Sequence, residues 1–142
     1  MANALYAKGK EKLLSATSAI SLDTDTIKAC LIINTYGQNL STDEFYTSIS
    51  AYLAGGASAT MNTQTLASKT VTDGVFDAAD ITFPAVTAGA TCEAVVLWKD
   101  TGVAGTSPLI AYIDTITGFP LLTNGGDVTV QWDNGAYKIF SL

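Results

Sequence analysis

Apolar positions along the chain recur with the two-residue period of β-strands much more than with the period of helices. The stretch 91–115 contains two apolar, β-branched runs joined by a loop rich in Gly and Thr. Alternate residues that share one face of the first run are apolar: Cys92, Ala94, Val96 and Trp98. The residues between them are largely apolar as well, so this strand is either covered on both sides or pressed against another subunit. We therefore expect an antiparallel hairpin at the centre of a sandwich.

Shorter alternating runs predict further strands. Residues 27–33 and 109–113 alternate in the same way, and Ile81 to Phe83 forms a short run before Pro84. The stretch 57–72 consists mainly of small and hydroxylic residues, which favours short edge strands with a weak register. These runs are short and show no βαβ alternation of strands with helices, so they predict an antiparallel all-β protein.

Two dipeptides predict tight turns. Asp73-Gly74 has turn chemistry, and Asn134-Gly135 is a preferred type I′ hairpin turn. A half-buried alternating strand precedes the second turn, so we expect residues 136–142 to return beside it as its partner strand. The chain would then end inside a sheet.

One segment carries a helix signal. Ser41 followed three residues later by Glu44 is a capping box, and apolar residues then recur every fourth position until Gly55 and Gly56. This pattern predicts one short helix near 42–54, covering an open end of the sandwich. At the other end of the sequence, residues 3–14 predict a short helix or an ordered arm, although Gly9 weakens a helix there.

Together these elements predict the fold class. About seven or eight short strands with no βαβ alternation favour an all-β, jelly-roll-like antiparallel β-sandwich. The length of 142 residues suits one such domain. We place an N-terminal arm at 1–22 and the sandwich domain at 23–142.

Charge changes the picture in two ways. Charged residues make up 14% of the chain, against roughly 25% in ordinary soluble domains. Such a surface suits a protein packed against neighbours, or a Thr-rich β-protein with few charges. The net charge is −6, and all seven basic residues are lysines, which disfavours nucleic-acid binding. Three of these lysines lie in residues 1–12. This cluster indicates either a cationic arm that docks onto an acidic neighbour or an ordinary solvated helix end.

Candidate chemistry is sparse. The chain has no His, so the commonest general base and the usual zinc ligand are missing. Asp73, Asp77 and Asp80 lack the spacing of an EF-hand loop and suit turns better than calcium. No carboxylate pair stands out for glycoside hydrolysis, and no phosphate-binding glycine motif occurs. We therefore expect no catalytic, cofactor or metal site, and a protein that is not an enzyme.

Cys30 and Cys92 each lie within an apolar run, which favours two buried free thiols over a disulfide and assembly in a reducing cytoplasm. The run after Lys12 is too short and too polar for a normal secretory signal, and no stretch has the length of a membrane span.

Six phrases, in this order, carry a resemblance: ALYAKGKEKLL, DTDTIKACLI, LASKTVTDGVFDAADITF, TCEAVVLWKDTG, SPLIAYIDT and NGGDVTVQWDNGAYKIF. Over nearly its whole length the chain resembles a family of small virion proteins of tailed bacteriophages, which we identify with the head decoration (cement) proteins. It departs from the family phrases at Lys10, where Arg is expected, and in a longer polar stretch at 15–21. Both departures bear on the contacts of the arm rather than on the fold.

The resemblance implies a jelly-roll subunit on the outer surface of a phage head, bridging neighbouring major capsid proteins. Its partners would be the major capsid protein and further copies of itself, as a dimer or trimer, with no nucleic acid and no membrane. It would be made in the host cytoplasm and reside on the capsid surface of the virion, and the family has no catalytic residues. From expected exposure we select these candidate contacts: Leu5, Tyr6, Lys8, Lys10, Lys12, Val103 and Phe119.

An alternative function is a phage tail, fibre or head-exposed module that binds host carbohydrate as a receptor. Jelly rolls bind sugars through exposed aromatic rings, and this chain offers four candidates: Tyr36, Tyr46, Tyr52 and Trp98. A third and weaker hypothesis is a small glycan hydrolase, because no carboxylate pair stands out.

Overall fold

The main sheet of the molecule is antiparallel and contains the central hairpin. The computed structural model describes residues 3–17, 19–55 and 63–142. In spatial order the sheet consists of β1 (Ala4–Leu5), β8 (Leu109–Ile113), β7 (Thr91–Lys99), β2 (Ile27–Ile33) and β3 (Thr63–Thr65), and β9 (Leu121–Leu122) pairs with the start of β7. The predicted hairpin of two apolar strands is confirmed as β7 and β8.

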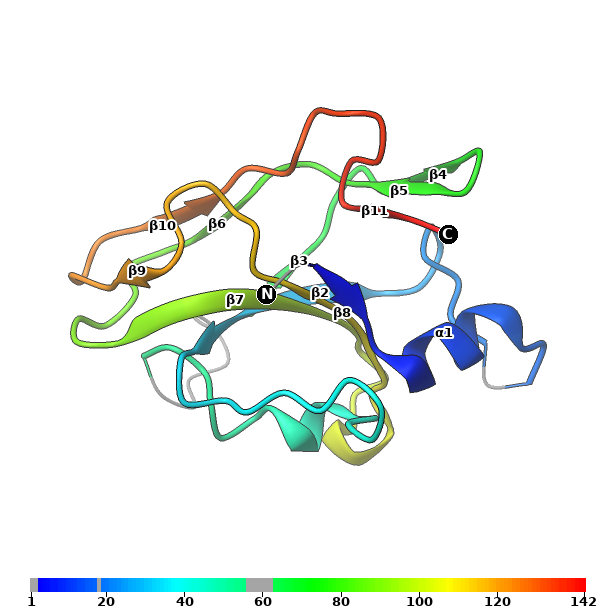
Figure 1. Cartoon of the computed structure of the whole chain (residues 1–142), viewed down its shortest axis with the longest axis horizontal. Helices are drawn as coiled ribbons and strands as arrows, with labels where there is room; N and C mark the ends of the chain where they lie inside the picture. Colours follow the sequence, from blue (N-terminus) through cyan, green and yellow to red (C-terminus); the bar gives the residue numbers. More distant parts are fainter. Residues whose placement is uncertain (1–2, 18, 56–62) are drawn as a thin grey trace.

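A second layer of short strands covers one face of this sheet (Figure 1). It contains a three-stranded sheet of β11 (Phe140–Ser141), β5 (Val75–Asp77) and β4 (Thr70–Thr72), and a pair formed by β10 (Val128–Val130) and β6 (Ile81–Phe83). Phe76 and Phe83 from this layer meet Leu97 and Ile110 of the main sheet in one buried cluster. The prediction of an all-β sandwich-like fold is confirmed.

The other face of the main sheet is covered by the segment that follows β2 (Figure 1). Tyr36, Ile49 and Leu53 of this segment pack with Cys30 and Tyr112 in a second buried cluster. Sheet strands with two apolar faces are therefore covered on both sides within one chain, as the sequence pattern allowed.

Regular helix is limited to α1 (Ala7–Leu14) and two single turns of 3₁₀ helix, η1 (Tyr46–Ser48) and η2 (Ala104–Thr106), within the described residues. The expectation of a short N-terminal helix is confirmed by α1. The division into an arm at 1–22 and a domain at 23–142 stays a prediction; β1 and α1 both contact β8 of the main sheet.

The predicted helix near 42–54 is wrong, because backbone groups in this segment bond to other strands. The N–H of Leu109 donates to the carbonyl of Glu44 at 2.8 Å, and the N–H of Tyr46 donates to the carbonyl of Ser107 at 2.8 Å. Phe45 forms a β-bridge with Pro108. Only the three residues of η1 become helical, and the apolar residues that suggested a helix are buried against the sheet instead.

The predicted hairpin at Asn134-Gly135 is also wrong. β10 pairs with β6, whereas β11 crosses to pair with β5. Trp132 holds the end of β10 beside the residues that precede β6. Its backbone N–H donates to Asp80 Oδ1 at 2.9 Å, and its indole N–H donates to the Ala79 carbonyl at 3.0 Å. Side-chain bonds of this kind compete with a hairpin ladder. The chain nevertheless ends in a sheet, as expected.

Other local predictions are confirmed. The Asp73-Gly74 turn joins β4 and β5, with positive φ at both residues, 52° and 79°, as a type I′ turn requires. The edge strands expected within 57–72 are β3 and β4; the part of that stretch from 57 to 62 lies outside the described residues.

The two cysteines are buried and free, as predicted. Their strands are neighbours, but Cys30 lies in the cluster under the 34–55 segment and Cys92 in the cluster under the second layer. Cys92 therefore does not share a face with Ala94 and Val96, contrary to simple alternation. A register shift opposite Ile32 and Ile33 inserts one extra residue in β7 and turns Cys92 to the other side.

Candidate functional site

The start of the chain is held on the main sheet by backbone bonds. The N–H of Tyr6 donates to the carbonyl of Ile110 at 3.0 Å, and the N–H of Ala7 donates to the carbonyl of Leu40 at 2.8 Å. The first bond continues the pairing of β1 with β8, and the second ties the start of α1 to the segment that follows β2. The helix therefore lies at a defined position beside the sheet.

Gly9 allows α1 to lie directly on the backbone of β8. A Cβ atom at this position would lie 2.5 Å from the carbonyl oxygen of Leu109 and 3.1 Å from Cα of Ile110. Gly9 is itself buried. The residue that weakens the helix in the sequence pattern is thus required for its packing.

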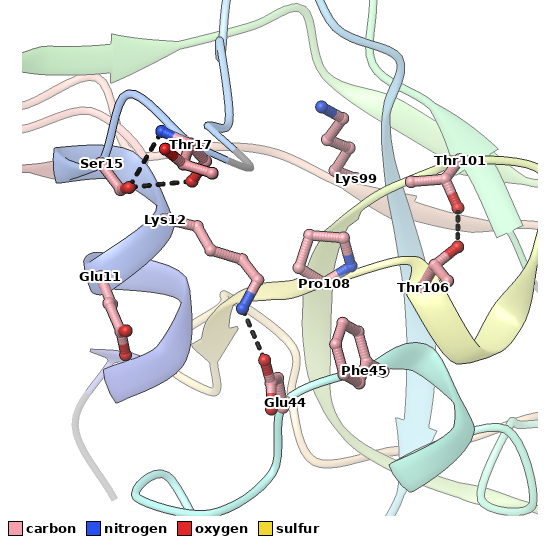
Figure 2. A pocket seen from close by; sticks show the side chains of 10 residues that line it. All are labelled: Glu11, Lys12, Ser15, Thr17, Glu44, Phe45, Lys99, Thr101, Thr106 and Pro108. Carbon is pink, nitrogen blue, oxygen red and sulfur yellow. Dashed lines mark hydrogen bonds and ion pairs between the residues drawn. The ribbon is translucent and has the colours of Figure 1, made fainter.

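A cleft opens between α1, the segment that contains Glu44 and Phe45, and residues 99–108 (Figure 2). Its volume is about 520 Å³, and its lining combines hydroxyl, charged and apolar side chains: Glu11, Lys12, Ser15, Thr17, Glu44, Phe45, Lys99, Thr101, Thr106 and Pro108. The mixed lining and the open shape suit contact with another macromolecule better than enclosure of a small molecule.

Lys12 and Glu44 form an ion pair across the cleft (Figure 2). Their Nζ and Oε1 atoms are 2.6 Å apart, and the side chains are 15% and 34% exposed. Lys12 Nζ also lies 5.3 Å from the centre of the Phe45 ring. The Lys12 charge is thus compensated within the chain, so the cleft is not built to bind an anion.

Two more ion pairs lie nearby. Lys99 Nζ is 2.9 Å from Asp25, and Lys28 Nζ is 2.7 Å from Asp100. The bond from Lys28 holds the pKa of Asp100 below its ordinary value. Burial alone would raise the pKa of Asp25, but the bonds from Lys99 and from the Ser21 N–H, together with the nearby lysine charges, outweigh it and lower the pKa. These lysines are also occupied within the chain.

The loop that contains η2 forms the far wall of the cleft. Thr101 and Thr106 join through their hydroxyls at 2.7 Å, and the Ser107 hydroxyl donates to the Val103 carbonyl at 2.8 Å. This network holds the Val103 side chain outward, with 60% of it exposed.

The structure brings only some of the predicted contact residues together. Lys12 lines the cleft and Val103 lies between two residues that line it. Lys8 pairs with Glu11 at 3.1 Å, and Lys10 is exposed on the same helix without an ion pair among the described residues.

Tyr6 was selected for expected exposure, and that expectation is wrong. It is fully buried, and its hydroxyl lies 3.0 Å from that of Tyr36, which in turn donates to Asp43 at 2.6 Å. Leu5 and Phe119 are partly buried against the core, and neither lines the cleft.

Lys12 is the only residue of the cleft lining that was selected from the sequence, and the exposed Leu14 and the cleft-lining Glu44 illustrate what was missed. Leu14, at the end of α1, is 83% exposed, a value that apolar periodicity alone does not foretell. Glu44 was read as part of a capping box, whereas its side chain pairs with a lysine 32 positions away. Only long-range structure reveals that pairing.

The aromatic residues considered for sugar binding are largely used in packing. Tyr36 and Trp98 are 5% and 6% exposed. Tyr46 lies against Trp98 with ring centres 4.2 Å apart, and Tyr52 lies 5.4 Å from Tyr36. These four rings do not form an exposed platform.

No family model matches the chain, and no curated protein matches it. Within the described ranges, no group of three or more His, Cys, Asp or Glu side chains is placed to hold a metal ion. None of the helices in these ranges combines the length and the apolar character needed to cross a membrane.

Proposed function

We propose that this chain is a virion structural protein, a capsid decoration or cement subunit. It binds the outer surface of a phage head and stabilises contacts between neighbouring major capsid proteins. Copies associate with one another as dimers or trimers on the capsid surface, after synthesis in the host cytoplasm. The role involves no reaction, no cofactor, no nucleic acid and no membrane.

The observation that carries this proposal is the way the chain uses its polar side chains. Four ion pairs occupy most of the lysines of the described residues, and the candidate aromatic rings pack on one another. Both faces of the main sheet are covered within the chain. Such a molecule suits the role of a stiff block that offers surface for contact.

The resemblance to head decoration proteins supports the same role. A cement protein needs a rigid scaffold and broad contacts, and many copies on one shell give avidity, so each contact can be modest. The light charge of the chain, 14%, fits a surface partly covered by neighbours.

The surface we assign to the capsid contact flanks the cleft. Leu14 and Lys10 project from α1 on one side, and Val103 projects from the η2 loop on the other. Leu14 and Val103 are exposed apolar side chains beside a cleft that also contains the Lys12–Glu44 ion pair. Such a surface is complementary to a partner protein surface of mixed polarity. An acidic patch on the capsid protein would complement Lys10.

The test is co-sedimentation of the purified protein with expanded phage heads that lack it, followed by heating of the decorated heads. We expect saturable binding and raised resistance to heat. Val103→Asp should weaken binding about ten-fold or more, because it places a charge in the contact. The matched control is Leu142→Asp, since Leu142 is 62% exposed and lies away from the cleft lining.

Wild-type protein that does not bind heads at saturating concentration would refute the proposal. Equal binding of heads by the two variants would instead show that the surface around the cleft is not the capsid contact.

One observation favours the alternative, a tail, fibre or head-exposed module that binds host carbohydrate. Tyr137 is 69% exposed beside a second cleft of about 880 Å³, where the side chains of Gln131 and Asn134 supply planar amide groups. Exposed rings and amides are the groups that recognise sugars. Glycan-array binding that Tyr137→Ala abolishes would favour this function, as would labelling of the protein at the tail tip.

A further inference from the structure

β4 forms an open edge of the second layer. The three-stranded sheet has the order β11-β5-β4, and all three residues of β4 are exposed. In Figure 1 the β4–β5 hairpin lies at the end of the upper layer, with β4 on its outer side. An open edge presents backbone groups that another strand can pair with, and proteins often blunt it with a charged residue, a proline or a bulge. The strand itself, Thr-Val-Thr, has no such charge or proline.

The register of the hairpin shows which backbone groups face outward. Val71 lies opposite Phe76, and the Phe76 carbonyl accepts the N–H of Ile139 from the far side, at 3.1 Å. In an antiparallel ladder, residues alternate between pairs that exchange hydrogen bonds and pairs that do not. Since Phe76 bonds toward β11, its pair with Val71 does not exchange bonds. The N–H and C=O of Val71 therefore point away from β5 into the open edge.

The Val71 side chain is also incompletely covered. Its cross-strand partner Phe76 is 1% exposed and lies in the core, so Val71 points toward the same side of the sheet. Val71 extends beyond the edge of that core and keeps 48% of its surface exposed. A strand added at this edge would bury it.

The sequence around Val71 is complementary to itself. Lys69 directly precedes β4 and Asp73 opens the turn that follows it, so antiparallel pairing of two copies about Val71 brings Lys69 of one copy near Asp73 of the other, at the ends of the paired strands. Opposite charges that lie close together attract one another. Lys69 already donates to the Asp25 carbonyl, but an ammonium group has three N–H donors and can serve both acceptors.

We propose that β4 is a homotypic dimer interface. A second copy pairs with it in antiparallel fashion about a two-fold axis at Val71, which joins the two three-stranded sheets into one. The inference deepens the proposed function, on which it rests for the expectation that copies associate, and it names the surface and the symmetry. Because the paired strands are short, the contact is weak in solution and gains from the high local concentration on a shell.

Disulfide trapping tests the geometry. Val71→Cys should form linked dimers under mild oxidation, because residues that exchange hydrogen bonds across antiparallel strands have Cα atoms about 5.5 Å apart, within disulfide range. Val103→Cys is the matched control, another exposed valine on a different surface. We expect linkage at least about ten-fold faster at position 71. The native thiols are buried and contribute little. Equal rates for the two variants would overturn the inference.

Sedimentation equilibrium of the unmodified protein over a range of concentrations supplies the second arm. Wild type should show a monomer–dimer equilibrium that Val71→Lys abolishes and Val103→Lys preserves. A wild type that remains monomeric up to the highest concentration at which it is soluble, or that forms trimers, contradicts the β4 interface. Heads are assayed in parallel: a monomeric wild type that still binds heads refutes only the β4 interface, whereas a dimer that does not bind heads refutes only the proposed function.

Discussion

Replacing Gly9 with Ala separates local helix preference from the packing seen in the structure. Helix propensity alone predicts that Gly9→Ala stabilises the protein, by about 1 kcal/mol. The structure predicts the opposite, because the new Cβ would lie 2.5 Å from the Leu109 carbonyl oxygen, with two atoms of Ile110 at 3.1 and 3.2 Å. All three neighbours are backbone atoms, which cannot swing aside as a side chain can. Either α1 or β8 must shift.

The expected size follows from these two effects. Overpacking costs about 1–3 kcal/mol, and a clash with backbone lies at the upper end of that range. Subtracting the helix gain of about 1 kcal/mol leaves a net loss of about 2 kcal/mol. Urea denaturation followed by Trp fluorescence measures it. Lys10→Ala, an exposed change in the same helix, should stay within about 0.5 kcal/mol of wild type. A Gly9→Ala protein as stable as wild type would show that α1 does not lie on β8.

Three further changes test other parts of the structure. Asp100→Asn should flatten the loss of stability in acid: because Lys28 lowers the folded-state pKa of Asp100, that pair stabilises the protein above about pH 4 and loses this effect as the pH falls through the folded-state pKa. Urea denaturation at pH 2.5 and pH 7 measures the loss of unfolding free energy in acid, and this loss should differ between wild type and variant by less than about 1 kcal/mol, because the pair is partly exposed. The same loss in both proteins would contradict the ion pair. Cys30 and Cys92 should resist a thiol reagent at pH 8 until urea is added, since burial raises the pKa of Cys92 to about 11 and also raises that of Cys30; rapid labelling of folded protein would place a thiol at the surface. Trp132→Phe should cost about 1 kcal/mol in urea denaturation through loss of the bond to Ala79, and no loss would argue against the crossing of the chain to β5.

Strand positions could be predicted where a run of apolar residues was long enough to need cover on both sides. The central hairpin of β7 and β8 and the face pattern of β2 are of this kind. The Asp73-Gly74 turn was predictable as well, because both positive φ angles match residues that tolerate them. In these places local preference and tertiary contacts agree.

The errors occur where long-range bonds outcompete a strong local signal. The capping box at Ser41 and Glu44 is present in the sequence, but the Glu44 carbonyl bonds to β8 and its carboxylate to Lys12. Asn134-Gly135 is a preferred turn, but Trp132 directs the chain to a different sheet. The hydrogen-bond partners of Glu44 and Trp132 lie far away in the sequence, so a single sequence does not identify them.

The candidate site was predictable only in part, for the same reason. Lys12 and Val103 were selected separately, as an arm residue and a loop residue, and the fold places them around one cleft. Tyr6 was expected at the surface, yet the pairing of β1 with β8 buries it. Exposure depends on which strands become neighbours, and spacing along the chain does not specify that.

A reconstruction of the intact virus particle that carries this chain tests the proposed function most directly. We predict density for the sandwich on the outer surface of the head, straddling boundaries between major capsid proteins, with α1 and the η2 loop toward the shell. Density for this fold only at the tail, or a head surface on which it is missing, would contradict the proposal.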